Sequence, residues 1–194
     1  MKPVDILREF YDPSSFTFKM LLIHGRAVAA KALAIANSLP ALTPDTAFIE
    51  EAALLHDIGI FLTHTPGLGC TGVHPYVCHG YLGRKLLERK GLFRHALVCE
   101  RHVGVGISAA DIDGMHLPLP RRDMRPVTIE EEIICYADKF FSKSETSNGK
   151  EKSTAEILAG LAPYGRDKVN QFLSWIDRFG NPKVSKNPMQ SESD

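Results

Sequence analysis

Apolar residues recur at intervals of three and four positions along most of the chain, which is the period of an amphipathic helix. A clear example is the stripe of Leu21, Val28, Ala32, Ile35 and Leu39. No stretch alternates apolar and polar residues for long enough to predict a strand. The pattern therefore predicts an all-α protein. The predicted helices cover residues 4–11, 16–39, 44–58, 75–90, 92–103, 128–141, 154–161 and 166–179.

Residues with strong preferences for helix ends mark several of these boundaries. Thr43 is the expected N-cap of the third helix, with Pro44 at its first position. Gly59 is the expected stop after that helix. Thr128 and Glu131 have the spacing of a capping box, in which each side chain bonds to the other residue's backbone.

Four segments lack a helical period and are expected to be irregular. They are residues 60–74, 108–127 (with one turn at 109–113), 142–153 and 181–194. The third is polar and predicts a mobile loop, and the last predicts a disordered tail. The remaining chain predicts a single-domain helical bundle over residues 1–180, with a core at about 16–141 and C-terminal helices to 179.

Composition narrows the class of protein. The chain has 194 residues, 44% of them hydrophobic, which is enough for one ordinary domain. Basic and acidic residues number 23 each, so a dedicated nucleic-acid-binding protein is not expected. The four cysteines form no CxxC pair, and no apolar run is long enough for a signal peptide or a membrane span. A cytoplasmic protein is the expectation.

The chemistry begins where the third helix ends, at His56-Asp57 after the apolar run 52–55. Neither side chain is readily buried without a partner. Other predicted helices carry His24, His79, His102 and Asp138 near their apolar faces. A single histidine in such a place is usually a hydrogen-bonded core residue. Six groups together need positive charge, and imidazole with carboxylate suits divalent iron, manganese or zinc. Six are more than one tetrahedral ion requires, which predicts two ions.

The order His24, then His56-Asp57-Ile58-Gly59, then Asp138 resembles the H…HD…D signature of the HD-domain metal-dependent phosphohydrolases, in the HDIG subgroup. His79 and His102 resemble the two extra histidines of members with a binuclear site. The resemblance implies a bundle of the HD-domain type. It also implies one ion held by His24, His56, Asp57 and Asp138, and a second held by His79 and His102, with Asp57 bridging.

One departure from the family concerns the residue that binds the substrate phosphate. Many members carry a lysine two or three residues after the HD pair, whereas this chain has Ile58-Gly59-Ile60-Phe61. Arg26, Arg101, Lys139, Lys143 and a cluster of three arginines could supply the charge instead. We assign catalytic roles to Asp57 and Lys139. Lys139 is chosen because it directly follows a predicted ligand. We assign substrate binding to Lys139, Arg121, Arg122 and Arg125, with the pocket walls formed by residues 60–74 and 104–127.

The expected function is hydrolysis of a phosphate ester or anhydride in a small nucleotide-type substrate by a metal-activated water. The alternative is a metal-stabilised module that senses a ligand or binds a partner with little turnover. A plain bundle with polar core residues would require all six groups to be coincidental. Whether the chain forms a homo-oligomer is left open by the sequence.

Overall fold

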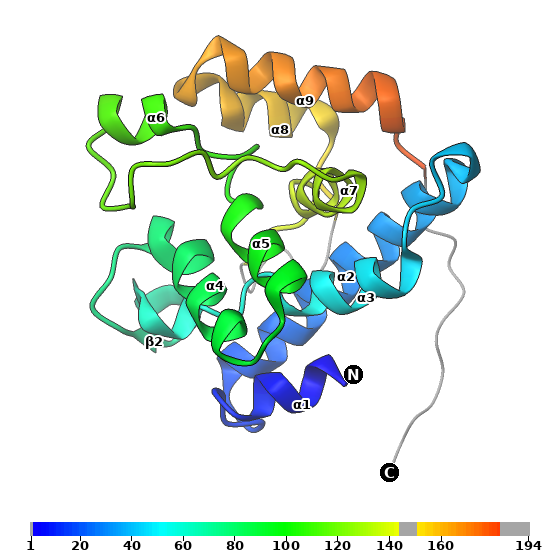
Figure 1. Ribbon diagram of the computed structural model, residues 1–194. Coiled ribbons are helices and arrows are strands. Elements are labelled where there is room, and N and C mark those ends of the chain that lie inside the picture. Colours follow the sequence, from blue (N-terminus) through cyan, green and yellow to red (C-terminus); the bar gives the residue numbers. More distant parts are fainter. Residues whose placement is uncertain (1, 144–150, 183–194) are drawn as a thin grey trace.

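A computed structural model describes residues 2–143 and 151–182. The predicted tail beyond residue 182, and residues 144–150 of the predicted mobile loop, lie outside the described residues. The prediction of an all-α fold is confirmed (Figure 1). The α-helices are α1 (Pro3–Arg8), α2 (Phe16–Ser38), α3 (Thr46–Leu55), α4 (His79–Arg89), α5 (Phe93–Arg101), α6 (Ala109–Gly114), α7 (Ile129–Asp138), α8 (Thr154–Leu161) and α9 (Arg166–Phe179).

Helix α3 begins later than the sequence predicts. Its N-cap is Asp45, whose Oδ1 accepts a hydrogen bond from the Phe48 amide at 3.0 Å. Thr43, the predicted cap, instead ends a 3-10 turn over Pro40–Leu42 with φ of 43°. An N-cap residue needs extended backbone, so a residue in the left-handed region cannot serve.

The predicted capping box of α7 is only half formed. The Thr128 hydroxyl accepts a hydrogen bond from the Glu131 amide at 3.3 Å, as predicted. The Glu131 carboxylate, however, accepts from the Val127 amide at 2.7 Å and from the Arg101 guanidinium at 2.8 Å. The Glu131 carboxylate can accept a charge-assisted bond from a backbone amide in either arrangement, so the additional bond to Arg101 decides where it lies.

The segment before α4 contains more structure than predicted. Two-residue strands β1 (His64–Thr65) and β2 (Cys70–Thr71) pair antiparallel, flanked by 3-10 turns at Ile60–Leu62, Pro66–Leu68 and Tyr76–Cys78. The prediction that the chain has no strand is therefore wrong here, because two residues are too few to show an alternating pattern. The last of these turns delays the start of α4 from residue 75 to His79.

Gly59 has a different role from the predicted helix stop. Its φ is −83°, which any residue can adopt. A Cβ atom at this position would lie 2.2 Å from the His79 carbonyl oxygen and 2.5 Å from the Gly83 amide nitrogen. The glycine is therefore required because the turn after His56-Asp57 packs directly on α4.

Among the described residues, two large hydrophobic clusters joined by helix α2 form most of the core, and a smaller third cluster consists of Ile107, Ile112 and Met124. One cluster packs the C-terminal half of α2 with α3, α7, α8 and α9. The other packs α1 and the N-terminal half of α2 with α5 and the turn after α3. His24 lies on α2 between Leu21 of the second cluster and Val28 of the first. Of the described helices, none has the length and apolar character needed to cross a membrane.

Candidate metal centre

Helix ends from distant parts of the chain meet at one buried place beside α2. His24 comes from the middle of α2, His56-Asp57 from the end of α3, and His79 from the first residue of α4. His102 follows the last residue of α5, and Asp138 ends α7. None of the six side chains belongs to a residue more than 5% exposed. The structure thus brings together all six predicted metal ligands.

Three of these residues form one group of potential ligands. The His24 Nε2 atom lies 2.9 Å from Asp138 Oδ1 and 3.2 Å from His56 Nε2. His56 Nε2 is 3.4 Å from the same carboxylate oxygen. Ligand atoms of His24, His56 and Asp138 are therefore close enough together to hold one cation.

Asp57 connects this group to the other two histidines. Its Oδ2 atom lies 3.1 Å from His56 Nε2 and 3.4 Å from His24 Nε2. Its Oδ1 atom lies 3.3 Å from both His79 Nε2 and His102 Nε2. The two oxygens of one carboxylate thus face two different sets of imidazoles, which is the arrangement expected of a bridging ligand.

Backbone carbonyls fix the orientation of three of the imidazoles. The Nδ1–H groups of His56, His79 and His102 donate to the carbonyl oxygen three residues earlier in the chain, at 2.6, 2.6 and 2.7 Å. A carbonyl oxygen can only accept, so each Nδ1 carries a proton and each Nε2 is directed to the centre. Histidine ligands of metal ions are commonly oriented by such a bond.

One buried carboxylate at this place has an oxygen that fits a metal ion. Among the described residues, Asp57 Oδ1 is buried without a hydrogen bond, whereas Asp57 Oδ2 forms an ion pair with Lys143 at 3.0 Å. Burying a carboxylate is costly unless a cation lies against it. Imidazole nitrogens with carboxylate oxygens are the donor set of zinc, iron and manganese sites.

Burial and nearby charges determine which histidines of the centre are protonated. Burial lowers the pKa of His24 to about 4 and that of His102 to about 3, so both imidazoles are neutral at pH 7. Burial acts in the same direction on His56, but the carboxylates of Asp57 and Asp138 outweigh it and raise the pKa of His56 to about 9. A bound cation would displace the His56 proton.

The two carboxyl groups are ionised although they are buried. Burial by itself would raise the pKa of Asp57, but His56 and Lys143 hold it well below its usual range. Burial would also raise the pKa of Asp138, and Lys139 and Lys143 reverse that effect. The centre therefore holds two ionised carboxylates beside the neutral imidazoles of His24 and His102 and the protonated imidazole of His56, whose proton a metal ion would replace.

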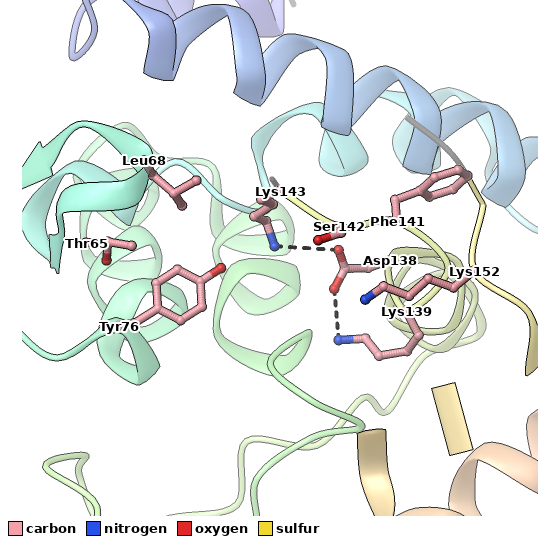
Figure 2. A pocket seen from close by; sticks show the side chains of 9 residues that line it. All are labelled: Thr65, Leu68, Tyr76, Asp138, Lys139, Phe141, Ser142, Lys143 and Lys152. Carbon is pink, nitrogen blue, oxygen red and sulfur yellow. Dashed lines mark ion pairs between the residues drawn. The ribbon is translucent and has the colours of Figure 1, made fainter. Parts of the chain in front are cut away.

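A cavity of about 420 Å³ opens beside Asp138 (Figure 2). Two lysines in its wall approach the carboxylates of the centre. Lys139 Nζ lies 2.8 Å from Asp138 Oδ2, and Lys143 Nζ lies 3.0 Å from Asp57 Oδ2 and 3.8 Å from Asp138 Oδ1. The other lining residues are Thr65, Leu68, Tyr76, Phe141, Ser142 and Lys152. A phosphate entering this cavity would meet ammonium groups next to the centre.

Tyr76 and Lys152 also line the cavity, although neither was predicted as a site residue. The Tyr76 ring stacks on the His79 imidazole, with centroids 4.5 Å apart and planes at 28°. Figure 2 shows its hydroxyl pointing into the cavity from the side opposite Asp138. The only signal in the sequence was the position of Tyr76 one helical turn before a predicted ligand.

The three predicted substrate-binding arginines lie outside the lining of this cavity. Arg121 pairs with Asp113, and Arg125 pairs with Asp123, in both cases at 2.9 Å. Arg122 pairs with Glu100, a buried carboxylate that also binds Arg84. Each guanidinium already has a carboxylate partner, so their substrate role stays a prediction that the placement does not support.

The other basic candidate on α5 is also engaged elsewhere. Arg101 Nη1 lies 2.8 Å from a carboxylate oxygen of Glu131. Segment 60–74 contributes Thr65 and Leu68 to the cavity wall, as the sequence analysis expects. Segment 104–127 contributes no residue to this cavity.

Comparison with known families gives one match, to the family model described as the HD domain, over residues 21–142. That range contains all six residues of the centre. It leaves out the first and last helices, so the limits of the predicted domain at residues 1 and 180 stay predictions.

Several curated proteins are similar to this chain. An uncharacterised protein of Methanocaldococcus jannaschii is 36% identical over 110 residues, covering 56% of each chain. A protein of Thermoplasma volcanium named tRNA (cytidine(56)-2'-O)-methyltransferase is 33% identical over 164 residues, which cover 80% of this chain and 42% of the relative. A protein of the same name from Picrophilus torridus is 29% identical over 133 residues, covering 68% of this chain and 34% of the relative. The matches thus span about half, or less, of the relatives' own lengths. No solved structure matches the chain.

Proposed function

This chain belongs to the HD-domain family, and from that premise we propose that it is a metal-dependent phosphohydrolase acting on a phosphate ester or anhydride of a small nucleotide-type substrate. The observation that carries the proposal is the position of Asp57, whose two carboxylate oxygens face two separate sets of imidazoles. A protein that needed a metal only for stability would be served by a single closed site. The run His56-Asp57-Ile58-Gly59 supports placing the chain in the HDIG subgroup.

Two divalent ions of the iron, manganese or zinc type fit the residues present. His24, His56 and Asp138 would hold one ion, His79 and His102 the other, and Asp57 both. When bound, such ions lower the pKa of water and neutralise phosphate oxygens. The rest of the chemistry falls to side chains around the cavity.

Lys139 and Lys143 supply the positive charge that the family's usual lysine would provide. Both ammonium groups lie beside the centre and line the cavity, so they can pair with the oxygens of a bound phosphate. Lys139 Nζ also donates to the His102 carbonyl oxygen at 3.3 Å, which fixes its position next to the second set of ligands. Leu68 and Phe141 form apolar parts of the same wall and would limit access of water to the reacting phosphate.

A second function has a specific observation in its favour. Relatives named as tRNA methyltransferases match this chain over less than half of their own length. A unit of this kind could serve those proteins as a metal-stabilised module that senses a ligand or binds a partner, with little turnover. A turnover assay distinguishes the two functions, because only an enzyme hydrolyses many substrate molecules per chain.

The test is hydrolysis by the purified chain supplemented with Mn²⁺, Fe²⁺ or Zn²⁺, with the nucleotide, nucleoside and phosphate products separated by chromatography. The substrates are nucleoside mono-, di- and triphosphates, dinucleoside polyphosphates and cyclic nucleotides. We expect turnover of at least one class, and a loss of at least 100-fold in Asp57→Asn, which keeps the side-chain shape but removes the charge. His95→Ala is the matched control, since His95 lies on α5 outside the centre. Equal turnover by Asp57→Asn and the parent would exclude a metal-dependent mechanism at this site.

A further inference from the structure

A second cavity of about 370 Å³ lies between the segment that follows His102 and the C-terminal helices. Val103, Val105 and Leu117 form one wall, and Leu161 and Tyr164 come from the end of α8 and the turn after it. This volume falls in the range of small-molecule sites, which are mostly apolar with a few polar groups. Residues 104–127, which the sequence predicts as a wall of the substrate pocket, line this cavity mostly through apolar residues and through Asp111, and none of the three arginines lines it.

The two cavities share Tyr76, which lines both. Its ring lies against the His79 imidazole, so one side chain connects the metal centre to the apolar cavity. The backbone makes a second connection. His102 is a predicted ligand whose carbonyl binds Lys139 of the first cavity, and the next two residues, Val103 and Gly104, line the second. A ligand lying across Tyr76 could therefore occupy both cavities.

The charged groups of the second cavity are already paired with each other. Lys168 Nζ lies 2.5 Å from Asp111 Oδ2, and it also approaches the Gly106 carbonyl oxygen at 3.5 Å. The Asp111 carboxylate further accepts hydrogen bonds from the backbone amide and the hydroxyl of Ser108, both at 2.7 Å. This cavity is thus suited to an uncharged group with a polar edge, and not to a second phosphate.

Large apolar side chains are exposed around this cavity. Tyr76, Met115 and Tyr164 are 38%, 45% and 63% exposed, and all three line it. Aromatic side chains exposed beside a pocket provide stacking surfaces for planar rings. The two tyrosine rings and the Asp111–Lys168 edge would add little to the binding of an aliphatic chain.

We propose that the second cavity is the specificity site for the nucleobase of the substrate, with Tyr76 between the base and the phosphate at the metal centre. The proposal rests on the phosphohydrolase function and adds the substrate class: a nucleotide recognised by its uncharged base. Tyr164 and Met115 would cover the base, and the polar edge near Asp111 and Lys168 would contact its ring nitrogens and amino groups.

The first experiment measures the cavity without any turnover. Binding of adenosine, guanosine, cytidine and uridine to the purified protein is followed by ligand-observed NMR, with octanol as an aliphatic probe. We expect at least one nucleoside to bind. Met115→Trp, which fills the entrance, and Tyr164→Ala, which removes a stacking surface, should each weaken that binding at least tenfold. Leu173→Trp is the matched control, because Leu173 is also exposed, lies on α9 and does not line the cavity.

The second experiment uses the reaction. Met115→Trp and Tyr164→Ala should lower kcat/KM at least tenfold for the nucleotide of the bound nucleoside, and leave methyl phosphate, which has no base, within twofold of the parent. Leu173→Trp should leave kcat/KM for both substrates within twofold of the parent. Absence of nucleoside binding, binding of octanol alone, or equal effects of the three variants would overturn the proposal. Nucleoside binding without hydrolysis of any substrate would refute the phosphohydrolase function and keep the nucleoside site.

Discussion

The Nε2 atoms of His79 and His102 lie 3.0 Å apart in the interior, although the two residues come from different helices. Both Nδ1–H groups are already bonded to backbone carbonyls, so the two Nε2 lone pairs are directed toward the same place as Asp57 Oδ1. Electron-rich atoms that converge without a donor between them repel one another, and a bound cation removes that repulsion.

Metal content should follow this geometry. We expect two divalent ions per chain by elemental analysis after supplementation. Asp57→Ala should lose both, because its carboxylate faces both sets of imidazoles, and His102→Ala should lose mainly one. His95→Ala should retain both ions. Full metal content in Asp57→Ala would show that this carboxylate does not bridge.

Removing metal should lower the melting temperature. The ions would tie the middle of α2 to the ends of α3, α4, α5 and α7, and this set of ligands is not assembled in the unfolded chain. At a free ion concentration one hundred times the dissociation constant, each site stabilises the fold by about 2.7 kcal/mol. Calorimetry with and without a chelator measures the effect. The Asp57→Ala variant should show no response to chelator, and an unchanged midpoint in the parent after confirmed metal loss would contradict the prediction.

Gly59→Ala should destabilise the fold and disturb the centre together. The new methyl group would lie 2.2 Å from the His79 carbonyl oxygen, so α4 must move away from the turn that follows His56-Asp57. Overpacking of this kind costs about 1–3 kcal/mol. Gly67→Ala is the control, since a Cβ there meets nothing within 4 Å. Urea unfolding and metal titration would reveal the difference, and equal behaviour of the two variants would refute the close approach.

The metal-free protein should be most stable near pH 6.5. His24 and His102 have pKa values of about 4 and 3 in the folded state, against about 6.5 when unfolded. The unfolded chain therefore binds more protons as the pH falls below 6.5, and the free energy of unfolding falls by up to about 1.4 kcal/mol per pH unit for each histidine. The pKa of His56 is raised to about 9, so its contribution is complete below pH 6.5 and is lost as the pH rises toward 9.

Urea unfolding of chelator-treated protein between pH 4.5 and 8.5 measures this dependence. His24→Ala should flatten the acid side of the profile. His116→Ala, at an exposed histidine, should leave it unchanged. A free energy of unfolding that does not vary between pH 4.5 and 6.5 would contradict the shifted pKa values.

Lys139 and Lys143 should affect turnover more than metal content. Replacing either by Met removes a charge beside the cavity without removing a ligand, and we expect at least a tenfold loss in kcat/KM, equivalent to about 1.4 kcal/mol. Alanine variants of Arg121, Arg122 and Arg125 in the same assay test the role that the sequence predicts for them. A large loss in an arginine variant, with both lysine variants fully active, would show that the phosphate is held elsewhere.

The sequence by itself determined most of the helices and the set of candidate ligands. Helical periodicity is a local property, and so the long helix at 16–39 and the helix ending at His56-Asp57 could be predicted within a few residues of their observed bounds. The order of His24, His56-Asp57, His79, His102 and Asp138 was readable for the same reason, because each lies on or at the end of a recognisable helix.

Only the tertiary structure decided where the long charged side chains point. Lys143 forms an ion pair with Asp57, which lies 86 positions earlier in the sequence. Arg121 and Arg125 pair instead with Asp113 and Asp123, which are nearby in the chain. A flexible basic side chain pairs with whichever carboxylate the tertiary packing brings within reach. The local sequence pattern therefore does not predict its partner. The sequence alone could not show that Tyr76 lies between the two cavities, because the residues that line them come from segments far apart in the chain.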